Sequence, residues 1–280
     1  MPSARLWIVA TPIGNPGELS PRAREVLKDA ALVLAEDTRR AAILFAKAGI
    51  RANRLLSFFE HNERERQNEA LAVLAAGNDV ALVTDAGTPL IADPGFRLTQ
   101  AAWAAGFRVC PVAGPSAPVA ALSAAGIAPI PFSFLGFLPR GERARADLFA
   151  SFAAVPGSLV FFERKDRLVE SLAQAYAVLG NRDFAICREL TKEHEEFIFG
   201  KLAESARLAA ALLGEITVII GPGEKAAKTP VDEAAGFLRE ALYSGASAKE
   251  AAKAVRNIVS GWSRAELYDL ALSLAERADK

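Results

Sequence analysis

An acidic turn that contains glycine follows a short apolar run at residues 80–83. In this turn Asp85 can bind an amine or a pair of hydroxyl groups, and Gly87 lets a ligand approach the main chain closely. The run before it, Val-Ala-Leu-Val, is typical of a strand that is buried on both faces of a parallel sheet. Because open α/β sheets bind ligands beyond the carboxyl ends of their strands, this turn is a candidate binding site. An ordinary strand–turn–helix connection would have a similar composition.

Two more turns rich in glycine and proline follow apolar runs, at residues 11–17 and 113–117. Glu36 and Asp37 follow another apolar run, and buried charges there would be costly unless they are paired or face a cleft. If the strands before the three turns are neighbours, the turns meet at one edge of the sheet. None of them has the spacing of a dinucleotide-binding or nucleoside-triphosphate loop. The sequence therefore predicts a ligand site of a different kind.

The first half of the chain alternates between expected strands and helices. We expect strands at residues 6–10, 31–35, 55–59, 80–83 and 107–112. Ser20 and Pro21 are typical of a helix start, as are Asp93 and Pro94, with the first residue of each pair as N-cap. A third helix is expected at residues 62–76 and a fourth after residue 117. This pattern predicts a parallel, doubly wound α/β sheet.

The composition changes at residues 127–140, which are aromatic and interrupted by proline, and we expect a domain boundary there. A second α/β unit follows, with helices at 141–154, 166–179 and 202–213 and strands at 158–162, 184–187, 197–200 and 216–220. After a polar linker, three helices are expected at 232–243, 247–259 and 263–278, and two of them begin with the capping-box spacing. The sequence thus predicts domains at residues 1–127 and 128–223, with a helical tail at 224–280.

The composition is that of a globular protein without a dominant charge. The 280 residues include 33 Lys and Arg and 33 Asp and Glu, so no overall field attracts nucleic acid or a membrane. The two cysteines, Cys110 and Cys187, and the two histidines have no metal-site or disulfide spacing, and we expect no metal. We find neither the long apolar core of a signal peptide nor a membrane-spanning run, which favours a cytoplasmic protein.

Several of these stretches stand in the order and spacing of one protein family. They are Thr-Pro-Ile-Gly-Asn at residues 11–15, Ala-Glu-Asp-Thr-Arg at 35–39, Thr-Asp-Ala-Gly-Thr-Pro at 84–89 with Asp-Pro-Gly at 93–95, and Ala-Gly-Pro-Ser-Ala at 113–117. Over nearly its whole length the chain resembles the tetrapyrrole-methylase-like (class III) S-adenosylmethionine methyltransferases. Residues 58–63, 161–163, 188–192 and 267–272 are similar to the branch that methylates a cytidine ribose 2′-oxygen in small-subunit (16S) ribosomal RNA.

The resemblance implies two α/β domains with S-adenosylmethionine in the cleft between them, a homodimer, and ribosomal RNA or the small ribosomal subunit as partner. Since a methyl sulfonium is positively charged, the carboxylates expected at the sheet edge are compatible with this cofactor. By analogy with the family, cofactor binding is carried onto residues of both domains. They are Pro12, Asp85, Ala86, Gly87, Thr88, Ala92, Asp93, Ser116, Ala117, Glu163, Leu190, Thr217 and Val218.

A ribose hydroxyl is a weak acid and benefits from a base or a nearby cation as it attacks the methyl carbon. Positioning this oxygen in line with the leaving group would supply much of the rate. The candidate groups for this chemistry lie after expected strands, and the sequence alone does not select one of them. They are Glu60, His61, Arg164, Lys165, Glu189 and Lys192, with Asp37 as a possible orienting carboxylate.

Two other functions are compatible with parts of the sequence. A methyltransferase of the same class could act on a small molecule or a tetrapyrrole, although the loop at residues 11–15 and the helical tail argue against it. A non-catalytic RNA-binding assembly factor would not need the intact Asp85 turn. In the tail, Lys249, Lys253 and Arg256 are spaced to share one helix face. This face is either a solvated surface or a contact with ribosomal RNA.

Overall fold

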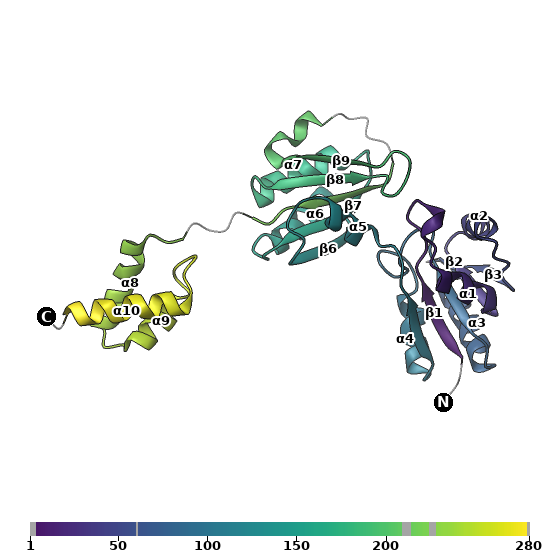
Figure 1. Ribbon diagram of the computed structural model, residues 1–280, viewed down its shortest axis with the longest axis horizontal. Coiled ribbons are helices and arrows are strands. Elements are labelled where there is room, and N and C mark those ends of the chain that lie inside the picture. Colours follow the sequence, from purple (N-terminus) through teal and green to yellow (C-terminus); the bar gives the residue numbers. More distant parts are fainter. Residues whose placement is uncertain (1–3, 60, 209–213, 224–227, 279–280) are drawn as a thin grey trace. The chain divides into compact units, whose positions relative to one another are not determined.

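The computed structural model describes residues 4–59, 61–208, 214–223 and 228–278. The chain divides into two compact units, residues 1–223 and residues 224–280, and each is described by itself. The first unit contains two five-stranded sheets, and the second is helical (Figure 1). The predicted α/β class with a helical tail is confirmed.

The first sheet consists of five parallel strands in the order β3-β2-β4-β1-β5. Its strands are β1 (Arg5–Val9), β2 (Leu32–Ala35), β3 (Leu55–Ser57), β4 (Val80–Val83) and β5 (Arg108–Val112). Strand β1 pairs with β4 on one side and with β5 on the other. The three strands that precede the glycine-rich turns are therefore neighbours, as the sequence argument required.

Helices cover both faces of this sheet because alternate strand residues are buried on opposite sides. α1 (Pro21–Asp29) and α2 (Thr38–Ala48) pack on the face of Trp7 and Val9, whereas α3 (Glu63–Ala75) and α4 (Phe96–Ala104) pack on the face of Leu6 and Ile8. The predicted cap of α1 is present, since Ser20 Oγ accepts a hydrogen bond from Ala23 N at 3.1 Å. A short 3₁₀ helix, η1 (Pro16–Glu18), precedes α1.

The expected start of α4 at Asp93 is wrong. The helix begins at Phe96, and its N-cap is Gly95 with a φ of 123°. A Cβ atom on Gly95 would lie 2.5 Å from Leu82 Cδ2, so the close approach of this turn to β4 requires glycine. Asp93 is left in the loop before the helix, where its carboxyl faces a pocket instead of capping α4.

The second sheet is mixed, with strand order β6-β7-β10-β8-β9. Its strands are β6 (Phe132–Phe137), β7 (Ser158–Glu163), β8 (Asp183–Arg188), β9 (Glu196–Lys201) and β10 (Ile216–Ile220). Strands β6 and β7 are parallel, and the other pairs are antiparallel. As a result, the amino end of β10 lies beside the carboxyl ends of β7 and β8.

Helices also cover both faces of the second sheet. α5 (Ala117–Ala124), which follows β5, packs on one face, and α6 (Glu142–Phe152), α7 (Leu168–Leu179) and η2 (Leu202–Arg207) pack on the other. The expected α-helix at residues 202–213 is wrong in its first part, because Leu202–Arg207 is a 3₁₀ helix. Leu202 and Ser205 are buried three residues apart, which matches the 3₁₀ repeat. Residues 209–213 lie outside the described residues.

The tail unit contains α8 (Val231–Tyr243), α9 (Ala248–Val255) and α10 (Arg264–Ala278), which pack around a small apolar core of their own. Both predicted capping boxes are present, Ser247 with Glu250 and Ser263 with Glu266. Trp262 is buried in this core and donates a hydrogen bond from Nε1 to Thr229 O at 2.8 Å. The tail thus has the internal contacts of an independently packed unit.

Candidate functional site

A pocket of about 570 Å³ lies in the first unit and is lined by residues of both sheets. This volume is in the range of cofactor and ligand sites. The first sheet contributes the connections after β1, β2, β4 and β5, and the second contributes the ends of β6 and β7, the loop after β8 and the start of β10.

Main-chain hydrogen bonds join the glycine-rich turns at this pocket. Thr11 N donates to Gly87 O at 2.8 Å, and Gly87 N donates to Thr11 O at 3.1 Å. Thr88 Oγ1 donates to Pro115 O at 3.1 Å and ties the third turn to the second. Gly87 has a φ of 84°, which favours glycine at the centre of this arrangement.

Three acidic side chains, Glu36, Asp85 and Asp93, line the pocket and form what we call the acidic cluster. Burial raises the pKa of Glu36, and the charge of Asp85 adds to this increase. Burial likewise raises the pKa of Asp85 despite the hydrogen bond that it accepts from Asp37 N at 3.1 Å. Burial, followed by repulsion from Glu36, raises the pKa of Asp93 to about 7. The described side chains around the cluster therefore do not supply enough positive charge to neutralise its three carboxyl groups.

The loop between β4 and α4 has an unusual backbone next to this cluster. Leu90 and Ala92 have φ values of 73° and 70°, in the left-handed region that side chains other than glycine rarely adopt. Such conformations cost about 1–3 kcal/mol each and often occur at ligand-binding sites. Ala92 and the neighbouring Ile91 line the pocket, so the strained segment is part of its wall.

Exposed basic side chains lie at the edge of the pocket, and we call Arg40, Arg164 and Lys165 the basic rim. Arg40 Nη1 lies 3.3 Å from Asp85 Oδ2, and Arg164 Nε lies 3.4 Å from Asp166 Oδ1. The site combines partly buried carboxylates with exposed cations, so it can attract a cationic group inside and an anionic group outside.

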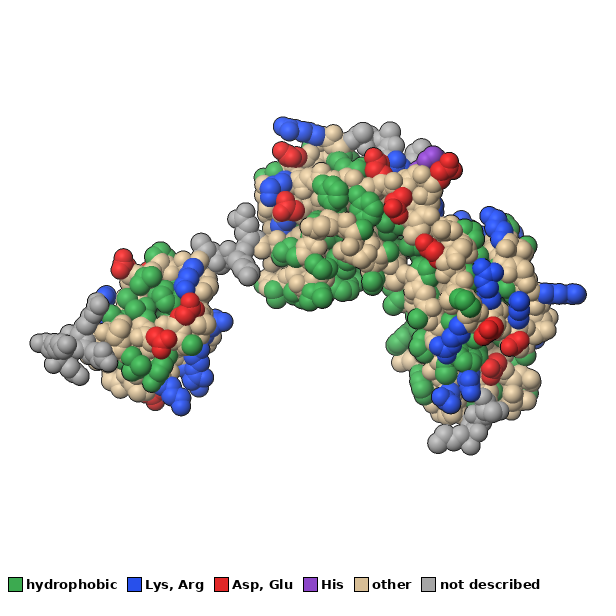
Figure 2. All heavy atoms as spheres, viewed as in Figure 1, with side chains coloured by type: hydrophobic (Ala, Val, Ile, Leu, Met, Phe, Trp, Pro, Cys, Tyr) green, Lys and Arg blue, Asp and Glu red, His purple; other side chains and the backbone are tan. Residues whose placement is uncertain are grey.

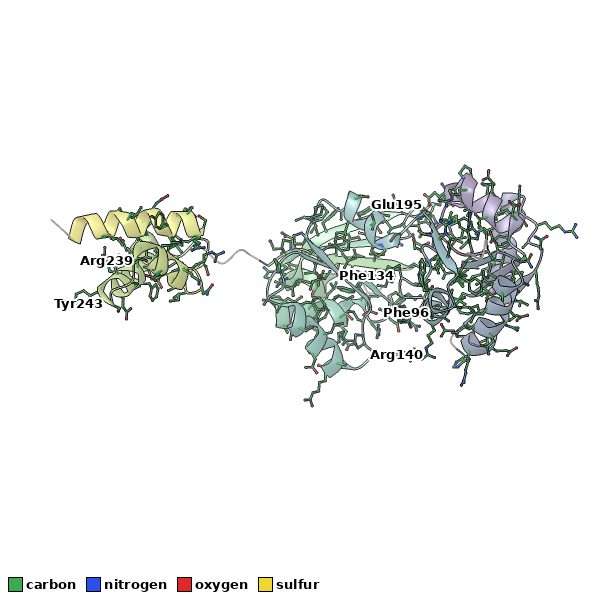
Figure 3. All side chains as sticks on the ribbon, turned by 90° about the horizontal axis from the view of Figure 1, so that it is seen from below. Phe96, Phe134, Arg140, Glu195, Arg239 and Tyr243 are labelled. Carbon is green, nitrogen blue, oxygen red and sulfur yellow. The ribbon has the colours of Figure 1, made fainter. Side chains whose placement is uncertain are left out.

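An aromatic side chain also faces the pocket. Phe137 at the end of β6 is 59% exposed, and its ring centroid lies 5.2 Å from that of Phe162. Phe162 in turn contacts Phe134 in a T-shaped arrangement with centroids 5.1 Å apart. Figure 3 labels Phe134 on the second sheet. Phe137 thus presents a supported ring to the site, and such a ring can stack on a base.

Glu163 lines the pocket, but its carboxylate accepts hydrogen bonds from neighbouring residues of the protein. Its side chain is fully buried and accepts hydrogen bonds from Arg164 N at 2.8 Å, from Arg167 Nη2 at 2.5 Å and from Ser171 Oγ at 2.6 Å. These contacts connect the end of β7 to the start of α7. Glu163 therefore shapes the pocket wall and leaves little acceptor capacity for a ligand.

The loop after β8 carries a second ionic group next to the pocket. Lys192 Nζ lies 3.0 Å from Glu189 Oε1 and 3.1 Å from Glu215 Oε2, and Glu215 lines the pocket. The hydrogen bond from Glu215 N and the contact with Lys192 lower the pKa of Glu189. The loop approaches the first sheet so closely that a Cβ atom on Gly14 would lie 2.7 Å from Leu190 O and 2.6 Å from Lys192 Cγ.

The structure brings most of the expected cofactor residues together. Eleven line the pocket, namely Asp85, Ala86, Gly87, Thr88, Ala92, Asp93, Ser116, Ala117, Glu163, Leu190 and Thr217. Pro12 does not line it, although its neighbour Ile13 does. Val218 is buried with α6 and α7 on the opposite face of the second sheet, because adjacent strand residues point to opposite sides.

The expected catalytic residues are less concentrated. Arg164 lines the pocket, and Glu189 and Lys192 reach its wall through Glu215. His61 is exposed, does not line the pocket and contacts the ring of Phe59. Glu60 lies outside the described residues.

Asp37 does not line the pocket either. Its carboxylate caps α2 and binds Arg39 at 2.7 Å, and these contacts hold the pKa of Asp37 well below its usual range. Asp37 meets the pocket only through its main chain, which donates the hydrogen bond to Asp85. The structure therefore gives this side chain a capping contact.

Among the pocket residues that the sequence does not single out as site residues are Arg40, Phe137 and Glu215. Arg40 follows Asp37 in the first turn of α2, directly after the carboxyl end of β2, and this position could have indicated it. Phe137 ends an aromatic strand whose pairing depends on the second sheet. Glu215 has no local signal, since it reaches the site only because β10 runs antiparallel to β7 and β8.

Comparisons with known proteins show the family to which the chain belongs. Tetrapyrrole (corrin/porphyrin) methylases match residues 5–206, which are more than half of its length. The chain belongs to this methylase family. A relative in Micromonospora olivasterospora, named ribosomal RNA small subunit methyltransferase I, is 43% identical over 99% of this chain and 89% of its own. A relative of the same name in Mesorhizobium japonicum is 43% identical over 97% of this chain and 92% of its own.

A third relative of that name, in Thermotoga maritima, is 42% identical over 222 residues, which are 79% of this chain and 99% of its own. Among solved structures, this methylase chain is similar to a uroporphyrin-III C-methyltransferase from Thermus thermophilus complexed with S-adenyl homocysteine. The TM-score is 0.57 at 20% identity, over 78% of this chain and 97% of that one. At this identity the likeness concerns the fold. Within the described residues, no helix is both long and apolar enough to cross a membrane.

Proposed function

We propose that the chain is an S-adenosylmethionine-dependent methyltransferase that modifies the 2′-oxygen of a cytidine ribose in small-subunit ribosomal RNA. The observation that carries this proposal is the 43% identity to a ribosomal RNA small subunit methyltransferase I over 99% of the chain. The match extends over both sheets and the tail, so the shared sequence includes every part of the pocket.

The residues of the pocket fit a cofactor of this chemistry. S-adenosylmethionine carries a positively charged sulfonium and an amine, and the pKa values of the acidic cluster are raised by burial and by repulsion from neighbouring carboxylates. A cation beside Glu36, Asp85 and Asp93 would relieve this repulsion. The turns at Gly87 and Ser116 offer main-chain groups for the polar parts of the same molecule. When bound, the cofactor supplies an electrophilic methyl carbon on a good leaving group.

The chain's own residues would bind and orient the acceptor. Arg164 and Lys165 in the basic rim are suited to phosphates next to the modified ribose, and Phe137 is suited to the face of a base. Lys192 is held between Glu189 and Glu215 at the pocket wall, where a cation assists a ribose oxygen that is losing its proton. We propose roles for Arg164, Glu189 and Lys192 in the reaction and none for His61.

A methyl-transfer assay tests the proposed function. Small ribosomal subunits from cells that lack the protein are incubated with the enzyme and S-adenosylmethionine labelled in the methyl group, and nuclease digestion locates the label. We expect one labelled cytidine with the methyl group on its ribose oxygen. Label on a base, or transfer only to a small molecule or a tetrapyrrole, would contradict the proposal. Cofactor binding without any transfer would favour a non-catalytic assembly factor.

We also propose that the chain acts as a homodimer in the cytoplasm. α4 supports a self-contact because Phe96 and Trp103, seven residues apart on one helix face, are 62% and 58% exposed. Figure 3 labels Phe96 on the first unit. Sedimentation of the parent and of the double variant Phe96→Ser/Trp103→Ser measures this. A parent that sediments as a monomer would remove the dimer from the proposal.

The three predicted domains are part of the same proposal. Each of the ranges 1–127 and 128–223 contains one complete sheet, and the division into compact units falls after Gly223. Limited proteolysis followed by mass determination tests the boundaries, because cleavage favours exposed connections between packed units. Initial cleavage inside either sheet would contradict them.

A further inference from the structure

The tail unit exposes a row of basic side chains that the pocket does not use. Lys249, Lys253 and Arg256 lie four and three residues apart on α9 and its C-cap, so they share one face, which we call the α9 basic face. All three are exposed, whereas the opposite side of α9 is buried in the core of the tail. Figure 2 shows Lys and Arg side chains gathered along the lower edge of the tail, the edge that α9 occupies in Figure 1.

Two acidic side chains of the tail near this face in sequence, Glu250 and Glu266, are bound within the tail. Glu250 accepts hydrogen bonds from Ser247 N at 2.9 Å and Ser247 Oγ at 2.6 Å. Glu266 accepts them from Ser263 N and Lys228 Nζ, both at 2.6 Å. Among the described residues of the tail, the single ion pair is the one between Lys228 and Glu266. Residues 224–280 contain equal numbers of acidic and basic residues, so the basic character of α9 comes from their arrangement.

Helix stability does not explain the whole row. Lys253 and Arg256 lie in the last turn and at the C-cap, where the helix dipole favours cations. Lys249 is the second residue of α9, where the helix dipole disfavours a cation. A lysine at this position therefore has a cost within the free protein, and an external anion would offset it.

The length of the row matches a nucleic-acid backbone. From position 249 to position 256 a helix rises by about 10 Å at about 1.5 Å per residue. In duplex DNA, phosphates on one strand follow each other at about 3.4 Å along the axis, so a row of this length spans roughly three phosphate steps. The long side chains of lysine and arginine allow each head group to reach a separate phosphate.

One relative is only about as long as the pocket-bearing part of this chain. The Thermotoga maritima protein is matched over 99% of its length by 222 residues of this chain, about the length of residues 1–223. That protein has the same name as the longer relatives. The tail therefore contributes something other than the pocket itself, and added affinity for the substrate particle is consistent with this.

We propose that the α9 basic face binds the phosphate backbone of ribosomal RNA in the small subunit and adds affinity without reading bases. This inference rests on the proposed function, which supplies the RNA partner, but it concerns a surface outside the pocket. Contacts with phosphates position a protein and make its binding dependent on salt. The tail would thus hold the enzyme on the particle while the basic rim of the pocket engages the modified nucleotide.

The test uses the full chain and purified small subunits from cells that lack the protein. In the triple variant Lys249→Gln/Lys253→Gln/Arg256→Gln, helix propensity is almost unchanged and no buried contact is lost. We expect the slope of log affinity against log salt concentration to decrease in magnitude by about 2 to 3, at roughly 0.7 to 0.9 per lost phosphate contact. S-adenosylmethionine affinity and the melting temperature should not change.

A matched control removes the same net charge elsewhere. Lys28, Lys47 and Arg51 are exposed and precede β2 and β3 at the amino edge of the first sheet, opposite the pocket edge. Lys28→Gln/Lys47→Gln/Arg51→Gln should keep the parent slope. An equal decrease in both triple variants would mean a general charge effect and would overturn the proposal.

The remaining outcomes are also decisive. An α9 variant with the parent's salt slope would contradict the inference, and weaker binding with an unchanged slope would indicate a ribosomal protein as the contact. If the parent transfers no methyl group, the proposed function fails. The salt slope of the α9 variant would still test the RNA contact, because binding is measured separately from turnover.

Discussion

Both sheets of the first unit place acidic side chains at the same pocket, but the two sets are in opposite electrostatic states. In the first sheet, burial raises the pKa values of Glu36, Asp85 and Asp93, and repulsion from neighbouring carboxylates adds to the increase. In the second sheet, hydrogen bonds lower the pKa of Glu189, and Arg167 neutralises the buried carboxylate of Glu163. Similar residue types at one site therefore have different tasks. The first set is left for a cationic ligand, whereas the second set is held in contacts within the protein.

The largest effect that would sharpen this comparison is on stability. Glu163→Gln removes the charge that neutralises Arg167, which is itself only 16% exposed. Because breaking a buried ion pair leaves an uncompensated charge, we expect a loss of about 3 kcal/mol in the free energy of unfolding. Urea denaturation measures it. Glu204→Gln, in the exposed pair with Arg207, should cost less than about 1 kcal/mol. Equal losses would mean that Glu163 is not structural.

The next effect is on cofactor affinity. Asp85→Asn keeps an acceptor for the hydrogen bond from Asp37 N but removes a charge from the acidic cluster. We expect S-adenosylmethionine to bind about 10- to 100-fold more weakly, in line with about 1.5–3 kcal/mol for a charged hydrogen bond. Calorimetry on the folded variant measures the affinity. Asp37→Asn retains the helix cap and serves as the control. If the two variants behave alike, the acidic cluster is not the cofactor site.

A smaller effect should separate substrate from cofactor. Arg164→Gln/Lys165→Gln removes two exposed charges of the basic rim without disturbing the acidic cluster. We expect methyl transfer at limiting subunit concentration to fall by about tenfold, or roughly 1.4 kcal/mol, with the cofactor affinity unchanged. Steady-state kinetics and calorimetry give the two quantities. A variant that loses cofactor affinity instead would show that these cations act in cofactor binding and not in substrate binding.

The last effect concerns the pH dependence of stability. Because the folded-state pKa of Asp93 is about 7 instead of the ordinary 3.8, the folded chain holds a proton that the unfolded chain has released. The contribution of Asp93 to stability therefore declines as pH rises from 3.8 to about 7. Asp93→Asn should remove this decline and make the ligand-free protein more stable above that range. Thermal melts across the range test it, and a variant that keeps the parent's pH profile would show that Asp93 is not its source.

Much of the fold could be predicted because its rules are local. The Ser20 cap, the two capping boxes of the tail and the apolar strands depend on neighbours in the sequence. The convergence of the turns at Thr11, Asp85 and Ala113 required only that β1 lie between β4 and β5. The pocket edge of the first sheet follows from these elements.

The rest depends on partners that are distant in the sequence. The sequence does not show that hydrogen bonds from Arg167 and Ser171 occupy the carboxylate of Glu163. It also does not show that Val218 points away from the pocket. The start of α4 depends on the close approach of Gly95 to Leu82, which the local pattern does not show. Asp93 lies before this N-cap and does not cap the helix. Where a side chain's role depends on a long-range contact, the local sequence pattern indicates the residue but not its role.

The close contact at Gly14 has a consequence for the size of the pocket. A side chain at Gly14 would collide with Leu190 O and Thr191 Oγ1. At this corner the loop after β1 and the loop after β8 therefore leave room only for the hydrogen atom of a glycine. Asn15 N also donates to Thr191 Oγ1 at 3.1 Å. One added methyl group would act as a spacer between the two sheets. Because Leu190 also lines the pocket, a shift of the loop after β8 at this corner would change the pocket wall without touching the acidic cluster.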